Sequence, residues 1–222
     1  MNDYIKIHGI ESIFTNDMTS YMELFLFKKN DHICKESIEV KYIYFFVEGK
    51  AKVYTTLSNG KSLLLCFYQN FRVLGDVELV GSKYAQTNVQ AIDDVYCIGI
   101  AYDKARIHLL NDAKFLRFVC NSLGEKLNRC SKNSSINLLY PLDSRLASYM
   151  LVVSKNTKSD DKDHIIFKEN LTEIAELLGT SYRHLLRTLN SFIENGYVKK
   201  LNNQYEVIDL KELTKIAADL YK

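Results

Sequence analysis

Hydrophobic and polar positions change their spacing along this chain, and the changes predict three regions. In the first hundred residues, short apolar or alternating runs recur with turn residues between them, and Asn59-Gly60 is a strong hairpin signal. Evenly spaced short strands of this kind are typical of a small β-barrel or jelly-roll. The runs expected to form strands are YIYFFV, KAKVYTTL, KSLLLCFY and VYCIGI.

The second region is a single long helix, expected from about Asp112 to Leu138. Apolar positions alternate there at intervals of four and three residues, a heptad pattern which predicts that two copies of the chain pair along this helix. A helix packed only on its own barrel is the alternative; Phe115, Phe118 and Val119 lie off the seam and could make that intramolecular contact while the seam faces a partner. The residues expected in the dimer interface are Leu116, Cys120, Leu123, Leu127 and Cys130.

The third region begins after the one proline of the chain, Pro141. We expect Pro141 and Asp143 to break the long helix and to cap a following helix that begins at Ser144. This break is the expected hinge between domains. The predicted organisation is a β-barrel domain over residues 1–111, a dimerisation helix and hinge over 112–140, and a C-terminal domain over 141–222.

Within the C-terminal domain, two short helices joined by a tight turn are predicted from Leu171 onward. Apolar residues recur at helical spacing before Gly179 and again after it. Gly179 lies where the first helix ends, because glycine adopts the left-handed capping conformation at little cost. Thr180 or Ser181 can then cap the second helix. This is the layout of a helix-turn-helix, whose second helix can lie in the major groove of DNA.

One face of the second helix carries side chains suited to reading base edges. An arginine can donate to O6 and N7 of guanine together, and an asparagine can pair with adenine in the same way. An ordinary helix pair with a solvated basic face is the alternative interpretation. The residues that share this face at a period of 3.6 are Tyr182, Arg183, Leu186, Arg187 and Asn190.

Composition narrows the classes of protein. The 222 residues carry a net charge of +2, so contact with DNA must depend on a local basic face and not on bulk charge. No apolar run approaches the ~18 residues of a membrane helix. Acidic residues at Asp3, Glu11, Asp17 and Glu23 argue against a signal peptide. We therefore expect a cytoplasmic protein with no membrane partner.

Candidate chemistry outside the helix pair is sparse. Five cysteines are scattered without a C-x-x-C pair, which argues against a disulfide framework or a zinc ribbon and favours buried structural thiols. A metal enzyme is the main rival for a jelly-roll, but no two of the five histidines have a strand-compatible H-x-H spacing. No local signature of Ser-His-Asp or Cys-His catalysis is found. We expect neither an enzyme, nor a metal site, nor a cofactor.

The order of these parts resembles the CRP/FNR family of bacterial transcription regulators over nearly the whole chain. The resemblance rests on YIYFFVEGKAKVYTTLSNGKSLLLCFY, on GDVELVG and on GTSYRHLLRTLNSFIENGYVKK. The strings SYRHLL, ELVG and HLLND are most similar to the YeiL-like branch of that family. The resemblance implies an α+β fold with an N-terminal double-stranded β-helix (a jelly-roll barrel of the cyclic-nucleotide-binding type), a long dimerisation helix and a C-terminal winged helix-turn-helix.

The resemblance also implies roles in DNA binding. Ser181 and Arg187 match positions that the family uses for phosphate and base contact. Tyr182 and Arg183 stand where the cyclic-AMP regulators have Arg-Glu. Because a guanidinium donates where a carboxylate accepts, we predict a half-site different from their TGTGA. The expected DNA-binding residues are Thr180, Ser181, Tyr182, Arg183, Arg187 and Asn190, with Lys199 and Lys200 in the wing.

The segment after Leu74 is similar to the family's effector loop, with departures from it. Asp76 stands for the family's ribose-binding Glu, and Glu78 adds a second negative charge. Residues 84–87 lack the Arg that neutralises a cyclic phosphate, and Lys83 replaces it only as a point charge. We therefore expect an effector other than cyclic AMP or cyclic GMP, or else a barrel corner that holds no ligand. The candidate pocket residues are Gly75, Asp76, Glu78, Gln86 and Thr87.

Two kinds of redox sensor, an iron–sulfur cluster and a thiol switch, can be compared with the positions of the cysteines. An iron–sulfur cluster of the FNR type needs clustered thiolates near the N-terminus, and residues 1–33 contain no cysteine. A thiol switch would place Cys120 and Cys130 opposite their symmetry mates on the dimer seam, where helix geometry seldom suits a disulfide.

The sequence thus predicts a homodimeric, sequence-specific DNA-binding transcription regulator that recognises palindromic double-stranded DNA. Its small-molecule effector is unidentified, and RNA polymerase is a further candidate partner. The two recognition helices would lie about 34 Å apart, one turn of DNA. The alternative is a cyclic-nucleotide-type sensor or protein-interaction module whose C-terminal helical hairpin binds a protein partner. A steep loss of DNA affinity with salt would separate the two.

Overall fold

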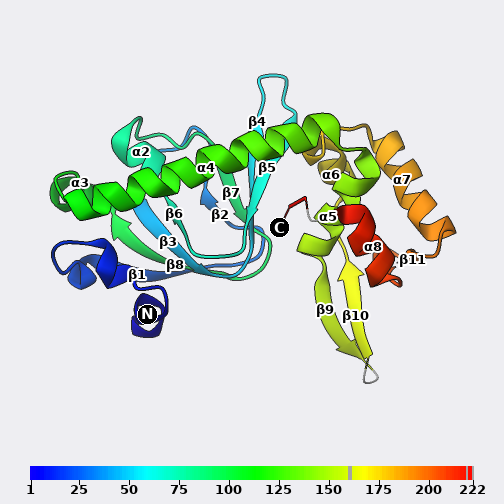
Figure 1. Cartoon of the computed structure of the whole chain (residues 1–222), viewed down its shortest axis with the longest axis horizontal. Coiled ribbons are helices and arrows are strands. Elements are labelled where there is room, and N and C mark those ends of the chain that lie inside the picture. Colours follow the sequence, from blue (N-terminus) through cyan, green and yellow to red (C-terminus); the bar gives the residue numbers. More distant parts are fainter. Residues whose placement is uncertain (160–161, 219, 222) are drawn as a thin grey trace. The chain divides into compact units, whose positions relative to one another are not determined.

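The computed structural model describes residues 1–159, 162–218 and 220–221. Two compact units are present, one of residues 1–56 and 65–130 and the other of residues 57–64 and 131–222. Figure 1 shows the elements in chain order. The long helix α4 (Ala113–Leu139) begins in the first unit and ends in the second.

The first unit is built around two four-stranded sheets with antiparallel pairing, ordered β1-β8-β3-β6 and β2-β7-β4-β5 (Figure 1). The four runs that the sequence predicts as strands form β3, β4, β5 and β8, so the jelly-roll prediction is confirmed. The strands are β1 (Met22–Phe27), β2 (His32–Cys34), β3 (Tyr42–Glu48), β4 (Ala51–Thr56), β5 (Ser62–Tyr68), β6 (Arg72–Leu74), β7 (Asn88–Ala91) and β8 (Val95–Ala101).

Strand β3 is buried on both of its faces, which explains why its sequence is an unbroken apolar run. Phe45 and Phe46 are both fully buried, yet they belong to different hydrophobic clusters. Successive side chains of a strand point to opposite faces, so neighbouring residues supply different cores. The cluster of Phe46 includes Cys97, and the cluster of Phe45 includes Ile5, from the N-terminal helix, and Phe115, from α4.

Short helices complete the first unit and cover one of these cores. They supply Ile5, Ile10 and Leu109 to the cluster of Phe45. Asp112 holds the start of α4, because its Oδ1 accepts from the backbone N–H of Lys114 at 2.9 Å. The elements are α1 (Asn2–Ile7), the 3-10 helices η1 (Ile10–Ile13) and η2 (Thr19–Tyr21), α2 (Asp76–Val80) and α3 (Tyr102–Leu109).

Helix α4 matches the long helix expected from the heptad pattern to within one residue at each end. Phe115 and Val119 are fully buried in the barrel core, and Phe118 packs against it, as the sequence predicts for residues off the seam. Among the described residues, no helix is both long enough and apolar enough to cross a membrane.

The cysteines divide into two groups. Cys66 and Cys97 are buried and Cys34 is half-buried, in keeping with structural thiols. Cys120 and Cys130, which the heptad pattern places on the dimer seam, are exposed on the single chain. Both lie on α4; Cys120 lies off the stripe that packs on the barrel core, whereas Cys130 lines the barrel cavity.

The second unit is a winged helix-turn-helix, as expected. Its sheet has the order β11-β12-β10-β9, and β11 and β12 form the antiparallel hairpin of the wing. The buried side chains of α5, α6, α7 and α8 form its core. The elements are α5 (Leu142–Val153), β9 (Lys155–Ser159), β10 (Lys162–Phe167), α6 (Leu171–Leu177), α7 (Tyr182–Glu194), β11 (Val198–Leu201), β12 (Gln204–Val207) and α8 (Leu210–Ala217).

The start of α5 differs from the prediction. The helix begins at Leu142 with Pro141 at the capping position, whereas the sequence predicts a start at Ser144 capped by Asp143. Pro141 has an extended backbone, and the helix begins at the next residue. That residue, Leu142, is buried in the core. Asp143 lies in the first turn, where its Oδ1 accepts from the backbone N–H of Ser144 at 2.7 Å.

Gly49, in the turn between β3 and β4, has a backbone conformation and surroundings that should not tolerate a side chain. It has a φ of +102°, and a Cβ there would lie 2.4 Å from the backbone oxygen of Asp94. We expect Gly49→Ala to lower the free energy of unfolding by about 2 kcal/mol or more, measured by urea denaturation, because strain and a clash with backbone add together. Gly124→Ala is the matched control. Gly124 lies within α4 with nothing within 4 Å of an added Cβ, and alanine there should stabilise by roughly 0.5–1 kcal/mol.

Candidate nucleic-acid interface and barrel cavity

The turn between α6 and α7 has the geometry that the sequence predicts. Gly179 has a φ of +61° and ends α6, while the N–H of Thr180 donates to the oxygen of Ala175 at 2.8 Å. Of the two candidate caps, Ser181 is the one used, since its Oγ accepts from the backbone N–H of His184 at 3.2 Å. The hydroxyl oxygen of Thr180 lies 3.3 Å from Nδ1 of His184. These bonds fix where the exposed face of α7 begins.

Helix α7 buries one stripe and exposes the opposite one. Leu185, Leu189 and Phe192 are buried in the core of the unit. The predicted base-reading side chains therefore lie outward: Tyr182, Arg183, Arg187 and Asn190 are all exposed, as is Ser181. Leu186, which the helical period also places on this face, is half-buried and so shared with the core. Thr180 is likewise half-buried.

The wing lysines are exposed but differ in their surroundings. Lys199 and Lys200 lie next to each other on β11, so their side chains point to opposite faces of the hairpin. Lys199 is directly across from Glu206 on β12, and Lys200 is across from Tyr205. An opposite charge across a ladder offsets part of the charge of Lys199. Lys200 has no acidic residue directly across from it, since Tyr205 is buried and uncharged.

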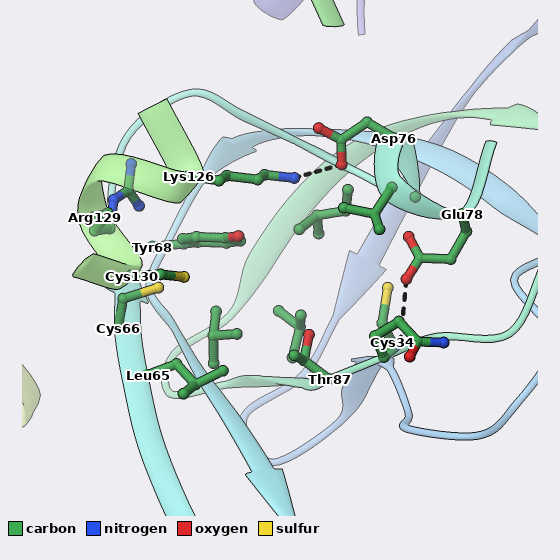
Figure 2. A pocket seen from close by; sticks show the side chains of 16 residues that line it. Cys34, Leu65, Cys66, Tyr68, Asp76, Glu78, Thr87, Lys126, Arg129 and Cys130 are labelled. Carbon is green, nitrogen blue, oxygen red and sulfur yellow. Dashed lines mark hydrogen bonds and ion pairs between the residues drawn. The ribbon is translucent and has the colours of Figure 1, made fainter. Parts of the chain in front are cut away.

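A second concave site lies in the barrel unit. A cavity of about 180 Å³ is lined by all five residues that the sequence proposes for an effector pocket, Gly75, Asp76, Glu78, Gln86 and Thr87. Figure 2 shows Asp76 and Glu78 on one side of this cavity and Tyr68, Cys66, Arg129 and Cys130 on the other. The remaining lining residues are Cys34, Val53, Leu65, Leu74, Val77, Val89 and Lys126.

The two carboxylates of the cavity have different partners. Asp76 is fully buried and forms an ion pair with Lys126, and it also accepts from the hydroxyl of Ser122 at 3.2 Å. Glu78 accepts from the backbone N–H of Gln86 at 3.3 Å. Burial raises the pKa of the Glu78 carboxyl, and hydrogen bonds from its own backbone N–H and that of Gln86 oppose this rise. Asp76 thus has a cationic partner in Lys126, whereas the pKa of Glu78 is raised by burial.

Sequence reasoning missed the two cations of the cavity, Lys126 and Arg129. Both come from α4, and Lys126 also donates to the backbone oxygen of Val73 at 2.8 Å. Arg129 lies over the ring of Tyr68, with 5.6 Å between the guanidinium carbon and the ring centroid. Charged residues three positions apart on a helix are ordinarily solvated, so nothing in the local sequence marks them as pocket residues.

No group of three or more His, Cys, Asp or Glu side chains placed to hold a metal ion is found within residues 1–159, 162–218 and 220–221. The side chains that line the cavity include three thiols, two carboxylates and two cations.

Comparison with known proteins assigns a class to each unit. Residues 24–109 match the family model for the cyclic nucleotide-binding domain, and residues 144–216 match the model for the Crp-like helix-turn-helix domain. A barrel of the first type followed by a helix-turn-helix of the second defines a class of transcription regulators.

The chain belongs to the CRP/FNR family of transcriptional regulators. It is 32% identical over 212 residues to the regulatory protein YeiL of Escherichia coli O157:H7, covering 96% of this chain and 93% of that protein. It is 18% identical over 211 residues to a CRP-like cAMP-activated global transcriptional regulator of Mycobacterium tuberculosis strain H37Rv, covering 94% of each. The resemblance to YeiL-like regulators inferred from the sequence is confirmed.

Solved structures support the same fold at low sequence identity. A putative crp/fnr-family regulator from Eubacterium rectale has a TM-score of 0.76 at 15% identity, covering 90% of this chain and 92% of that one. A CRP-family regulator from Thermus thermophilus has a TM-score of 0.70 at 17% identity, covering 89% of this chain and 98% of that one.

Proposed function

We propose that this chain is a homodimeric, sequence-specific DNA-binding regulator whose α7 helices lie in successive major grooves of a palindromic site. One observation supports this above all. Arg183 and Arg187 are exposed on the face of α7 opposite its buried stripe, directly after the cap at Ser181. Guanidinium groups at that position of a helix-turn-helix are placed to bond base edges.

The other polar residues near this face have secondary roles in the proposal. Tyr182 and Asn190 flank the arginines and contact adjacent bases. Ser181 and Thr180, at the N-terminus of α7, hold a phosphate together with the backbone N–H groups of the first helical turn. In the wing, Lys200 contacts the backbone next to the groove, and Lys199 contributes less.

Pairing of two copies along α4 is the second part of the proposal. The seam residues differ in how far their own barrel covers them. Leu127 is 71% exposed and Cys120 is exposed, while Leu123 packs partly on the barrel core. A large exposed leucine in the middle of a helix that buries its other face favours a helix partner. Pairing of this kind would give the protein the two-fold symmetry of a palindrome.

We expect Leu127→Glu to raise the dissociation constant of the dimer roughly 100-fold, because each dimer would bury two unpaired carboxylates at the seam. Sedimentation equilibrium over a range of concentrations measures the change. Asn128→Glu adds the same charge one position away on an exposed, off-seam residue, and it should leave the dimer intact. Equal dissociation constants for the two variants would exclude α4 pairing through Leu127.

For the barrel cavity, we propose a small effector that is not a cyclic nucleotide. Asp76, at the family's ribose-binding position, is already paired with Lys126. Residues 84–87 contain no arginine, and the second cation of the cavity, Arg129, comes from α4 and not from that loop. A cyclic phosphate would therefore meet Glu78 without an arginine from the loop to neutralise it. A cavity without any ligand is the competing proposal.

Calorimetric titration with cyclic AMP and cyclic GMP should show no binding in the low micromolar range, for the reason just given. A dissociation constant of a few micromolar for either nucleotide would contradict this part of the proposal. In that event, loss of the affinity in Arg129→Ala would identify the cation that replaces the absent loop arginine.

The DNA-binding proposal is tested against the protein-partner alternative by salt. Neutralising even two or three phosphates should reduce the affinity for duplex DNA roughly 10- to 40-fold between about 50 and 200 mM salt, because bound counterions are released. Fluorescence anisotropy with a labelled duplex measures this slope. A protein that binds no duplex at low salt would instead favour a C-terminal hairpin that binds another protein.

A further inference from the structure

The face of α4 that packs on the barrel changes from apolar to charged along the helix. Phe115 and Val119 are buried in the barrel core, whereas Lys126 and Arg129, further along the helix, line the cavity. Helical periodicity places all four side chains on one face. This face lies off the seam that is proposed to pair two copies, so its charged end belongs to the barrel of its own chain.

The two cations of this face differ in their partners. Lys126 pairs with the buried carboxylate of Asp76. Arg129 forms no ion pair with any residue that the structure describes. The carboxylate one turn before it, that of Glu125, lies 4.0 Å from Arg72, and the Glu125 side chain is 67% exposed. Arg129 therefore brings a positive charge without a carboxylate partner to the wall of the cavity.

A buried tyrosine lies beside this charge. The guanidinium carbon of Arg129 is 5.6 Å from the centroid of the Tyr68 ring, and Tyr68 is only 6% exposed. The Tyr68 hydroxyl makes no hydrogen bond to any of the described residues, and Figure 2 shows it pointing into the cavity. Burial raises the pKa of this hydroxyl, so it keeps its proton at neutral pH and can donate. Arg129 and Tyr68 thus offer a cation and a hydrogen-bond donor to one anion.

The rest of the cavity limits the size of the molecule that it can hold. Its volume is about 180 Å³, and an apolar cavity of roughly 150 Å³ is large enough for benzene. A cyclic nucleotide, with a base, a sugar and a phosphate, is far larger than benzene. Aliphatic side chains form most of the remaining wall: Val53, Leu65, Leu74, Val77 and Val89. These dimensions suit an apolar body of one ring or one short branched chain.

The side of the cavity away from Arg129 limits the charge of the molecule. Figure 2 shows Glu78 there, and its carboxylate accepts from the backbone N–H of Gln86 at 3.3 Å. A second anion beside this buried carboxylate would meet repulsion in a poorly solvated site. An α-amino acid carries both of its charges on one carbon, so it could not place them at Glu78 and at Arg129 together. The arrangement favours a single negative charge at the Arg129 end.

We propose that the barrel cavity binds a small monocarboxylate with a compact apolar body, an aromatic or a branched-chain acid. The ligand carboxylate accepts from the guanidinium of Arg129 and from the hydroxyl of Tyr68, and its apolar body lies between the aliphatic walls. This inference rests on the proposed effector role of the cavity and deepens it by naming the class of ligand.

Such a ligand would connect the barrel to the long helix. Tyr68 is the last residue of β5, and Arg129 lies on α4. Because α4 is the helix proposed to pair the two subunits, a carboxylate held by both residues gives the ligand a direct means of favouring one position of α4 on the barrel.

Equilibrium dialysis of the full-length protein with labelled benzoate tests the ligand class without any variant. Benzoate should bind with a dissociation constant below about 1 mM, and 3-methylbutanoate should compete with it. Benzamide has nearly the same shape without the charge, and it should bind at least about tenfold more weakly. Terephthalate adds a second carboxylate at the far end of the ring and should also bind at least about tenfold more weakly. Equal binding of benzoate and benzamide, or no binding of benzoate below that limit, would overturn the proposal.

Variants then assign the roles of the individual side chains. Arg129→Gln should weaken benzoate binding about tenfold or more, whereas Arg117→Gln removes the same charge from an exposed position on α4 and should leave binding unchanged. Tyr68→Phe removes only the hydroxyl and should weaken binding roughly three- to tenfold. Glu78→Gln should restore the binding of terephthalate. Circular dichroism verifies the fold of each variant. Unchanged benzoate binding in folded Arg129→Gln would overturn the role of Arg129.

Affinity for duplex DNA tests the effector role separately. Saturating benzoate should change this affinity about fivefold or more, and Arg129→Gln should show no change at the same benzoate concentration. Benzoate that binds without changing the DNA affinity would overturn the effector role and support the ligand class alone. A protein that binds benzoate, but no DNA at any benzoate concentration, would count against the DNA-binding proposal and not against the ligand class.

Discussion

Replacing Arg183 and Arg187 together by alanine should reduce affinity for a specific duplex roughly 30-fold or more, since each lost base contact is worth about 1–3 kcal/mol. Both side chains are exposed and leave the buried stripe of α7 untouched, so the fold should be unaffected. Fluorescence anisotropy gives the affinity, and circular dichroism verifies the fold.

Two controls sharpen the result. Lys211→Ala with Lys215→Ala removes the same charge from the exposed side of α8 in the same unit, and it should cost far less affinity. Arg183→Lys keeps the charge but loses the bidentate donor, so it should relax sequence preference more than it weakens binding to random DNA. Unchanged affinity in the double arginine variant would remove α7 as the DNA-reading element.

The largest expected effect on stability comes from the ion pair in the barrel cavity. Lys126→Met would leave Asp76, which is fully buried, without its counter-charge. We expect a loss of roughly 3–5 kcal/mol in the free energy of unfolding of the barrel, because an uncompensated carboxylate must be kept out of water. Urea denaturation followed by tyrosine fluorescence measures it.

A double-mutant cycle separates the effect of the lost charge from the effect of altered packing. Asp76→Asn combined with Lys126→Met should recover much of the lost stability, since no buried charge remains. Glu125→Ala, at an exposed neighbouring position that lies 4.0 Å from Arg72, should change stability by only about 0.5 kcal/mol. A Lys126→Met protein as stable as the original would show that Asp76 does not depend on this lysine.

Features that depend on nearby residues were predictable from the sequence. The helix-turn-helix follows from two apolar stripes around Gly179, and a serine or threonine after that glycine supplies the cap. The five effector-pocket residues lie between positions 75 and 87, and the resemblance to the family's effector loop brought them together before any fold was known. The strands were predictable because each follows from a local apolar run between turn residues.

Features that depend on how distant segments pack were not predictable. Lys126 and Arg129 reach the cavity only because α4 lies against the barrel, and their spacing on the helix is that of ordinary surface charges. The start of α5 was misplaced because the core requirement for Leu142 outweighs the capping preference of Asp143.

The central claim is tested most directly by selection from a random duplex pool with reduced wild-type protein beside the Arg183→Ala, Arg187→Ala variant. We expect an enriched palindrome with half-sites one helical turn apart, distinct from TGTGA and absent with the variant. Enrichment of TGTGA half-sites would contradict the roles given to Tyr182 and Arg183. A palindrome that the variant enriches equally would contradict the assignment of α7 as the reading helix.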